Sequence, residues 1–373
     1  MTDPGPSPRT TRPRPMAAPL RIAALLVAPL TLAGLLLPGA ARAQEIVPGD
    51  ASARGPADAA PRVEWGLVIH GGAGTIRRSE MTEERAAEYR AKLTEALNAG
   101  HAVLAEGGSA VDAVVAAITI MEDSPLFNAG KGAVFTSSGT NELDASIMNG
   151  ADLNAGAVAG VKRVKNPILL ARAVMENSSH VMFARDGAEA FAEEQGLELV
   201  PEEYFHTESR MRSLERAKER AAAERSSALP TESEKLGTVG AVARDRSGDL
   251  AAGTSTGGIT NKLWGRVGDA PIIGAGTYAS NESCGVSATG QGEFFIRNVV
   301  AYDICARVKY TGATVTEATR AVILGRLVEQ EVLGGVVVMG ADGEIAMEFN
   351  TEGMYRGWIG PDGAVTVKMY ADE

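Results

Sequence analysis

The sequence has few of the residues from which metal centres and disulfide frameworks are built. It contains two cysteines and four histidines in 373 residues. The histidines are scattered without metal-ligand spacing, which argues against a zinc site. Cys284 and Cys305 could pair in an oxidising compartment, but their apolar flanks favour two small buried hydrophobic side chains instead.

Positive charge is outweighed by negative charge, with 36 Lys and Arg against 47 Asp and Glu, and the common nucleotide-binding motifs are missing. The formal net charge is −11, and an acidic surface repels a phosphate backbone, so we expect no nucleic-acid partner. The glycine-rich stretch 71–74 follows an apolar run, yet it matches neither the dinucleotide-binding nor the P-loop spacing. We interpret it as a turn with close backbone packing at a sheet end, rather than as an anion cradle.

The one long apolar run, residues 22–37, lies near the N-terminus and is typical of a secretory signal peptide. Arginines precede it and Ala41-Arg42-Ala43 follows it as a small-x-small cleavage site. The run is shorter than the roughly 20 residues that span a bilayer, so we favour a signal peptide over 1–43 rather than an uncleaved anchor. Its removal takes away five arginines and one aspartate and leaves a mature chain near −15. We therefore expect a secreted or periplasmic protein with no membrane association after cleavage.

The remaining sequence predicts an α/β protein. Residues 44–62 are rich in Ala, Pro, Gly and Asp and predict a disordered lead-in. Strands and helices follow by periodicity and capping signals, with two helix pairs between groups of strands, so we expect two stacked sheets with helices outside, a four-layer arrangement. Strands are expected at 63–70, 133–136, 142–148, 155–161, 238–244, 250–256, 271–275, 284–288, 335–340 and 344–349. Helices are expected at 82–106, 109–121, 166–177, 187–195, 291–310 and 315–331.

Residues 202–227 are dominated by Glu, Arg, Lys and Ala. They have the propensity for a helix but lack the apolar stripe that would dock one. We interpret the segment as a mobile tether rather than as an exposed helix.

The tether leads into Gly237-Thr238-Val239-Gly240, which we interpret as a self-cleavage site. A threonine at a new N-terminus carries its own base, the α-amine, which titrates at about 7.7–8.0. Gly237 tolerates the strained backbone that an attack on its carbonyl needs. Taken alone, however, the motif is more typical of a plain loop-to-strand junction.

Arg266 and Asp269 stand three residues apart in a glycine-punctuated loop. Arginine can hold a carboxylate bidentately and aspartate can hold an ammonium, so the pair suits the α-groups of an amino acid. By spacing alone, a surface salt bridge is the more common explanation.

Seven motifs, taken together and in order, resemble the plant-type L-asparaginase / isoaspartyl peptidase family of N-terminal-nucleophile hydrolases. The resemblance covers nearly the whole mature chain. The motifs are His70-Gly-Gly-Ala-Gly74, Asn128-Ala-Gly-Lys-Gly132, Glu142-Leu-Asp-Ala145, Gly237-Thr-Val-Gly-Ala-Val242, Thr254-Ser-Thr-Gly-Gly-Ile-Thr-Asn-Lys262, Gly265-Arg-Val-Gly-Asp269 and Thr289-Gly-Gln-Gly-Glu293.

The resemblance implies an αββα fold, autoprocessed into an α subunit (63–237, with 202–236 as a mobile linker) and a β subunit (238–373) of an (αβ)₂ heterotetramer. It implies cleavage between Gly237 and Thr238, and hydrolysis of L-asparagine and β-aspartyl dipeptides without a cofactor for the chemistry. The implied roles are nucleophile (Thr238), its orienting hydroxyl (Thr256), oxyanion donors (Thr289 hydroxyl and Gly290 N–H, with Asn128 nearby) and substrate α-carboxylate and α-ammonium binding (Arg266, Asp269, completed by Gly290 and Gly292).

The stretch 121–131 resembles the family's sodium-binding loop, which uses backbone carbonyls, so side-chain composition could not reveal it. The carbonyls implied are those of Met121, Glu122, Ser124, Phe127, Ala129 and Lys131.

The sequence departs from the family pattern at Leu236, where histidine is common, and at Gln291, where threonine is common. The first puts the cleavage rate in question and the second affects the pocket. Two competing functions remain open. One is a periplasmic glycosylasparaginase, which usually has aspartate in place of Gly237, and the other is a non-catalytic aspartate-binding protein.

Overall fold

A computed structural model describes residues 61–74, 76–224 and 237–373. The expected signal peptide and nearly all of the expected lead-in lie outside the described residues. Within the described part of the chain, no helix combines the length and apolar character that a membrane crossing requires.

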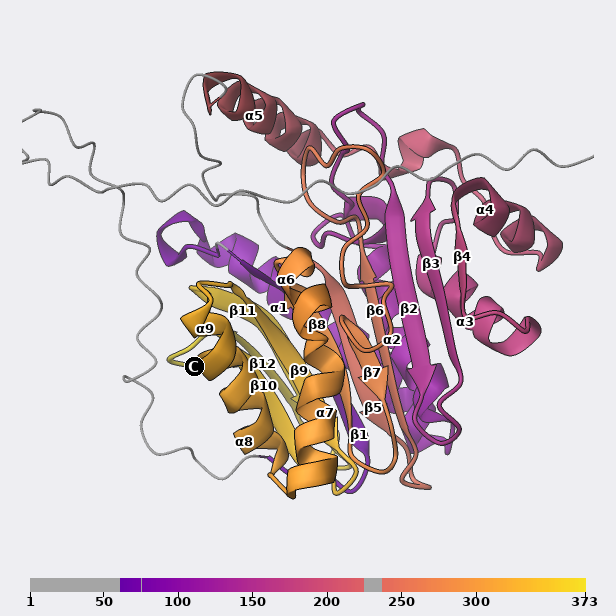
Figure 1. Ribbon diagram of the computed structural model, residues 1–373, viewed down its shortest axis with the longest axis vertical. Helices are drawn as coiled ribbons and strands as arrows, with labels where there is room; N and C mark the ends of the chain where they lie inside the picture. The colour runs from indigo at the N-terminus through magenta and orange to yellow at the C-terminus, as the bar shows by residue number, and fades with distance from the viewer. Residues whose placement is uncertain (1–60, 75, 225–236) are drawn as a thin grey trace, which may run out of the picture. The chain divides into compact units, whose positions relative to one another are not determined.

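Two β-sheets form the centre of an α/β fold (Figure 1). The larger sheet has the order β12-β11-β1-β5-β6-β2-β3-β4 and the smaller one the order β10-β9-β8-β7. Neighbouring strands are antiparallel except β3 and β4. The strands are β1 (Gly66–Gly74), β2 (Leu143–Asn149), β3 (Ala155–Val161), β4 (Met182–Ala184), β5 (Val239–Arg244), β6 (Leu250–Thr256), β7 (Thr277–Ala279), β8 (Cys284–Gly290), β9 (Gly334–Gly340), β10 (Ile345–Phe349), β11 (Gly353–Ile359) and β12 (Val365–Tyr370).

Helices cover the outer face of each sheet. α1 and α2 pack on the larger sheet, and α7 and α8 pack on the smaller one. One apolar cluster lies between each sheet and its helices. A third lies between the two sheets, where Val68 and Val242 meet Val337 and Met339. The helices are α1 (Glu83–Ala105), α2 (Ala110–Glu122), α3 (Pro167–Asn177), α4 (Arg185–Glu194), α5 (Glu208–Glu224), α6 (Gly292–Asn298), α7 (Val300–Thr311), α8 (Val315–Arg320) and α9 (Leu327–Glu329), with 3-10 turns η2 (Arg78–Glu80), η3 (Gly130–Gly132) and η4 (Glu202–Phe205) and the π-helix η5 (Ala321–Arg326).

The strands expected at 133–136 and 271–275 are absent. A side chain binds backbone carbonyls of the first segment, and a helix binds those of the second. The carbonyls of Ala133 and Val134 accept from the Asn141 side chain (3.0 and 3.1 Å). Gly274 and Ala275 accept from the first-turn amides of α7, which starts after Val299 in the left-handed region (φ 48°). That residue also divides the single helix expected over 291–310 into α6 and α7. Four strands were not expected: the three-residue strands β4 and β7, and the strands β11 and β12. In the larger sheet β11 pairs with β1, and β12 pairs with β11.

The prediction that residues 202–236 form a tether without a docked helix was wrong for the described part of this segment. Residues 208–224 form helix α5, and 225–236 lie outside the described residues. Leu214 and Ala217 are buried (3% and 6% exposed), so a narrow apolar stripe of two residues docks the helix where a wide one was thought necessary.

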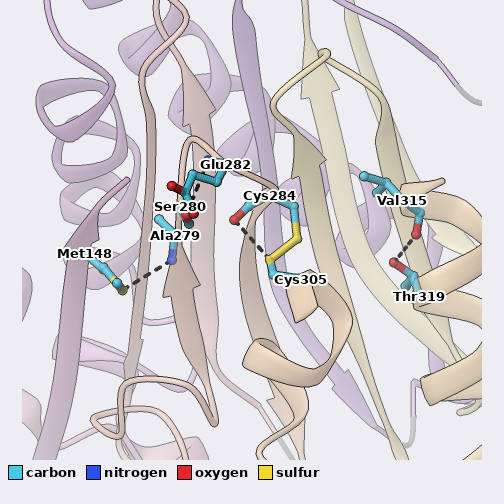
Figure 2. Close-up of a disulfide and its surroundings, with 8 residues drawn as sticks. All are labelled: Met148, Ala279, Ser280, Glu282, Cys284, Cys305, Val315 and Thr319. Atoms are coloured by element: carbon cyan, nitrogen blue, oxygen red, sulfur yellow. Dashed lines mark hydrogen bonds between the residues drawn. A yellow bond between two sulfur atoms is a disulfide. The ribbon is translucent and has the colours of Figure 1, made fainter. Parts of the chain in front are cut away.

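The expectation of two unpaired cysteines was also wrong. Cys284 in β8 and Cys305 in α7 form a disulfide (Figure 2). Both side chains are buried, as their apolar flanks suggested. The flanks could not reveal that α7 packs on β8 and brings the two Cα atoms within 5.3 Å.

Candidate active site

The β5–β6 hairpin brings the Gly237–Thr238 peptide beside Thr256. Val239 pairs with Ser255 across the two strands, so Thr238, just before β5, faces the end of β6. The Thr238 Oγ1 lies 3.1 Å from the Thr256 Oγ1. The pairing of β5 with β6 therefore places the hydroxyls of Thr238 and Thr256 side by side.

Three donor groups converge on the carbonyl oxygen of Gly237. It lies 2.8 Å from the Asn128 Nδ2, 2.8 Å from the Thr238 Oγ1 and 3.1 Å from the Thr256 Oγ1. The single Thr238 proton can be donated either to this carbonyl or to the Thr256 hydroxyl, but not to both at once. The carbonyl that precedes Thr238 is therefore held where charge on its oxygen would be stabilised.

The Asn128 side chain is fixed in place by its other hydrogen bonds. Its Nδ2 also donates to the Gly258 carbonyl (2.7 Å), and its Oδ1 accepts from the Val134 amide (3.0 Å). With every polar atom of the amide engaged, its orientation is determined. The donor aimed at Gly237 is thus preorganised.

Strand β1 passes directly against the Gly237–Thr238 peptide. The stretch 71–74 is not the expected turn: the strand continues to Gly74, with a β-bulge between His70 and Gly72. Gly72 has φ +108°, and a Cβ there would lie 3.0 Å from the Gly237 Cα and 3.1 Å from the Thr238 nitrogen. Next along β1, the Ala73 amide donates to the Thr289 hydroxyl (3.3 Å), which places Thr289 at the same end of the sheets.

A buried histidine lies beside strand β5, and its sequence position had suggested no role. The His70 Nε2 lies 3.0 Å from the Ser287 Oγ of the smaller sheet. Burial lowers the pKa of His70 to about 3, against a weaker opposing hydrogen bond with the Thr238 backbone, so the ring is neutral. The bridge passes over Gly240, where a Cβ would lie 1.8 Å from the Ser287 Oγ. The available signal was a histidine inside a strand whose residues are all buried.

The residues expected to bind the α-groups of an amino acid, Arg266, Asp269 and Gly292, lie next to one another. The Arg266 guanidinium holds the Glu293 carboxylate bidentately, at 2.8 and 2.9 Å. A Cβ at Gly292 would lie 2.7 Å from the Arg266 Nη2 and 2.9 Å from the Asp269 Oδ1, so glycine leaves the space between the two charges open. The surface salt bridge that spacing favoured is contradicted for this pair: Arg266 pairs with Glu293, and Asp269 is 7% exposed.

Asp269 has the electrostatics of a carboxylate that lacks its counter-ion. Burial raises its pKa to about 7, although Arg266 lowers it in part. Its Oδ2 has no hydrogen-bond partner among the described residues. An ammonium group bound there would supply both a charge and a donor.

Gly258 lies between the residues around the Gly237 carbonyl and Arg266. Its carbonyl accepts from Asn128, and its amide donates to the Thr256 Oγ1 (3.0 Å). Its φ is +79°, and a Cβ there would stand 3.6 Å from the Arg266 Nη1. Gly290 ends β8 directly after Thr289 and before Gly292, and a Cβ there would overlap Phe295 (2.4 Å).

Two buried charged residues lie behind Thr256, and their motif positions had suggested no role. Asp144 in β2 pairs with Thr256 across the strands, and its Oδ1 accepts from the Gly160 amide (2.8 Å). Burial raises the pKa of Asp144, against the attraction of Lys262. The Lys262 Nζ donates to the Glu142 carbonyl (2.8 Å).

The stretch 121–131, where a sodium-binding loop was expected, packs closely against its own backbone at two glycines. A Cβ at Gly130 (φ +48°) would lie 2.3 Å from the Glu122 carbonyl oxygen, and one at Gly132 would lie 2.1 Å from that of Phe127. These glycines allow the loop to fold tightly around its own carbonyls. Among the described residues no cluster of His, Cys, Asp or Glu side chains could hold a metal ion, and a carbonyl site requires none.

Comparison with known proteins identifies the family. The family model described as asparaginase matches residues 63–368. The chain belongs to the asparaginase family. Among curated members, the isoaspartyl peptidase of Salmonella typhimurium is 49% identical over 294 residues, covering 78% of this chain and 94% of the relative. That of Escherichia coli is 47% identical (82% and 96% covered), and a probable isoaspartyl peptidase/L-asparaginase 2 of Arabidopsis thaliana is 43% identical (82% and 99% covered). The family match spans both halves of the site, from His70 to Glu293.

Proposed function

We propose that this protein is an autocleaving hydrolase that acts on β-aspartyl dipeptides and L-asparagine through an N-terminal threonine. The observation that carries the proposal is the convergence of the Asn128, Thr238 and Thr256 donors on the Gly237 carbonyl oxygen. A plain loop-to-strand junction needs no such convergence. The names of the relatives, isoaspartyl peptidase and L-asparaginase, support the substrate class.

Maturation begins when the Thr238 Oγ attacks the Gly237 carbonyl carbon. The negative charge that forms on the oxygen is stabilised by the Asn128 amide and the Thr256 hydroxyl. The C–N bond breaks, the Thr238 nitrogen takes up the proton, and an ester joins Gly237 to the Thr238 oxygen. Water hydrolyses the ester, which frees a Gly237 carboxylate and a Thr238 with an α-amine and a hydroxyl.

Turnover repeats this chemistry on a substrate. Arg266 binds the α-carboxylate, which takes the place of Glu293, and Asp269 binds the α-ammonium. The Thr238 amine accepts the hydroxyl proton as the oxygen attacks the β-carbonyl, and the oxyanion is bound by the Thr289 hydroxyl and the Gly290 N–H, with the Asn128 side chain beside them as a further donor. Ammonia or an amino acid leaves with the proton, and water then releases aspartate from the ester.

The wider assignment follows the same family pattern. The two facing sheets with helices outside support a four-layer αββα fold, cut into α and β subunits and assembled as (αβ)₂. A sodium ion held by the carbonyls of 121–131 would fix the loop that carries Asn128 and take no part in the chemistry. The N-terminal 43 residues would direct the chain to secretion or the periplasm.

Gel analysis and assays test the proposal. On an SDS gel the purified protein should give two fragments, one of them starting Thr-Val-Gly-Ala by Edman degradation, and Thr238→Ala should stay whole. Cys284 and Cys305 both follow Thr238, so the fragments should separate without reductant. Ammonia release from asparagine and aspartate release from a β-aspartyl dipeptide measure the two activities. Full activity from an uncut chain would refute the proposal.

A further inference from the structure

The segment before α5 is anchored on the loop that follows α2. Phe205 is fully buried in the core beneath the larger sheet. The Tyr204 ring lies 5.3 Å from the Lys131 ammonium, and the His206 ring lies 5.1 Å from Phe135. Two successive contacts thus hold residues 202–206 against residues 131–135.

Arg210, in the first turn of α5, extends this anchoring. Its Nε donates to the Gly132 carbonyl (2.7 Å), and its Nη2 lies 3.5 Å from the Leu126 carbonyl. In the described part of the chain no carboxylate forms an ion pair with it, whereas its neighbour Arg212 pairs with Glu208. A guanidinium bound by carbonyls in this way fixes backbone rather than balancing a charge.

The two carbonyls that Arg210 contacts lie on either side of Asn128 in the chain. The Leu126 carbonyl also accepts from the Tyr89 hydroxyl of α1 (3.1 Å), so the loop is held between α1 and α5. Figure 1 shows α5 over the loops at this end of the sheets. Between the two anchors stands the side chain that donates to the Gly237 carbonyl.

We propose that residues 202–217 form a clamp on the active-site loop 126–135, and that Arg210 is a positioning residue for Asn128. This rests on the proposed function of Asn128 as an oxyanion donor. Arg210 precedes the cleavage site by 27 residues, and its contacts do not involve the scissile peptide. The clamp therefore acts both before and after cleavage, and α5 is part of the mature active site rather than a spacer.

Arg210→Met tests the clamp, because methionine keeps an apolar stem and removes every donor. Arg216→Met is the matched control, since Arg216 is an exposed residue of the same helix and contacts only Ser213 among the hydrogen bonds of the described residues. Removing an oxyanion donor costs about 10²–10³ in rate, so loosening one should cost about tenfold. We expect Arg210→Met to cleave itself and turn over about tenfold more slowly, with KM changed less than twofold and the melting temperature close to that of Arg216→Met. Arg210→Lys should recover part of kcat.

Hydrogen exchange measured by mass spectrometry provides a readout that does not depend on activity. In a Thr238→Ala background, Arg210→Met should speed exchange in peptides covering 126–135, and Arg216→Met should leave it unchanged. Unchanged exchange together with wild-type kcat in Arg210→Met would overturn the clamp. An equal loss in both variants would assign the effect to the helix as a whole and would also refute it. A wild-type protein that neither cuts itself nor turns over would instead refute the proposed function, and the exchange result would still decide the clamp.

Discussion

The electrostatics of Asp269 lead to a prediction with two independent measurements. Its pKa is raised to about 7, chiefly by burial, whereas a free aspartate titrates near 3.9. Only the ionised carboxylate binds an ammonium group well. Below pH 7 the free enzyme should therefore lose substrate affinity, and at pH 6 about one molecule in eleven would carry the charge.

Steady-state kinetics distinguish this titration from that of the nucleophile. A bound α-ammonium holds Asp269 ionised, so Asp269 affects kcat/KM but not kcat. The Thr238 amine, near 7.7–8.0 in free peptides, affects both. We expect KM for asparagine to rise about fivefold between pH 7 and pH 6, as the ionised fraction of Asp269 falls from about one half to about one in eleven, in addition to the fall in kcat. A KM that stays constant over this range would refute the assignment of Asp269 to the ammonium.

The same shift has a consequence for stability. A carboxyl group whose pKa is higher in the folded state than in the unfolded chain binds its proton more tightly when folded, so the free energy of unfolding falls as pH rises from about 4 to 7. A shift of about three units corresponds to at most ~4 kcal/mol. Asp269→Asn should therefore be inactive on asparagine yet more stable than the wild type at pH 8. Urea unfolding of both proteins in a Thr238→Ala background measures the difference, and a less stable Asp269→Asn protein would contradict the reasoning.

Three further predictions follow from the contacts. Asn128→Ala should slow self-cleavage by about 10²–10³, seen as persistence of the intact chain in a gel time course, and cleavage at the wild-type rate would exclude Asn128 as a donor. Gly240→Ala places a Cβ on Ser287 and should cost roughly 3 kcal/mol or more in urea unfolding, part of which Ser287→Gly should restore. Replacing both Cys284 and Cys305 by alanine opens a loop of 21 residues and should lower the free energy of unfolding by about 3 kcal/mol without changing the gel pattern at neutral pH; an unchanged unfolding curve would count against the disulfide.

Local patterns predicted most of the strands and helices, because each depends on periodicity and capping within a few residues. Thr82 and Ser109 cap α1 and α2 where their sequence positions indicated. Several of the misses depend on partners far along the chain. Residues 271–275 have the pattern of a strand, but the carbonyls of Gly274 and Ala275 accept from α7, and β11 joins the larger sheet by pairing with β1, with β12 on its other side.

The candidate site shows the same division. Motif resemblance alone brought together Thr238, Thr256 and Asn128, and the structure places these three around one carbonyl. It could not give roles to Ser287 or Arg210. Those side chains reach across from the second sheet and from a helix that sequence reasoning treated as a tether.

The strand order of the larger sheet decides what self-cleavage would leave behind. A cut before Thr238 makes β1 through β4 one polypeptide and β5 through β12 another, yet β1 stays between β11 and β5, and β5 and β6 stay between β1 and β2. Strands of the two products alternate in the sheet. Separating them would therefore break the hydrogen bonds on both sides of β1 and on both sides of the β5–β6 pair. Separation should accompany global unfolding, and two chains made apart should not readily assemble this sheet.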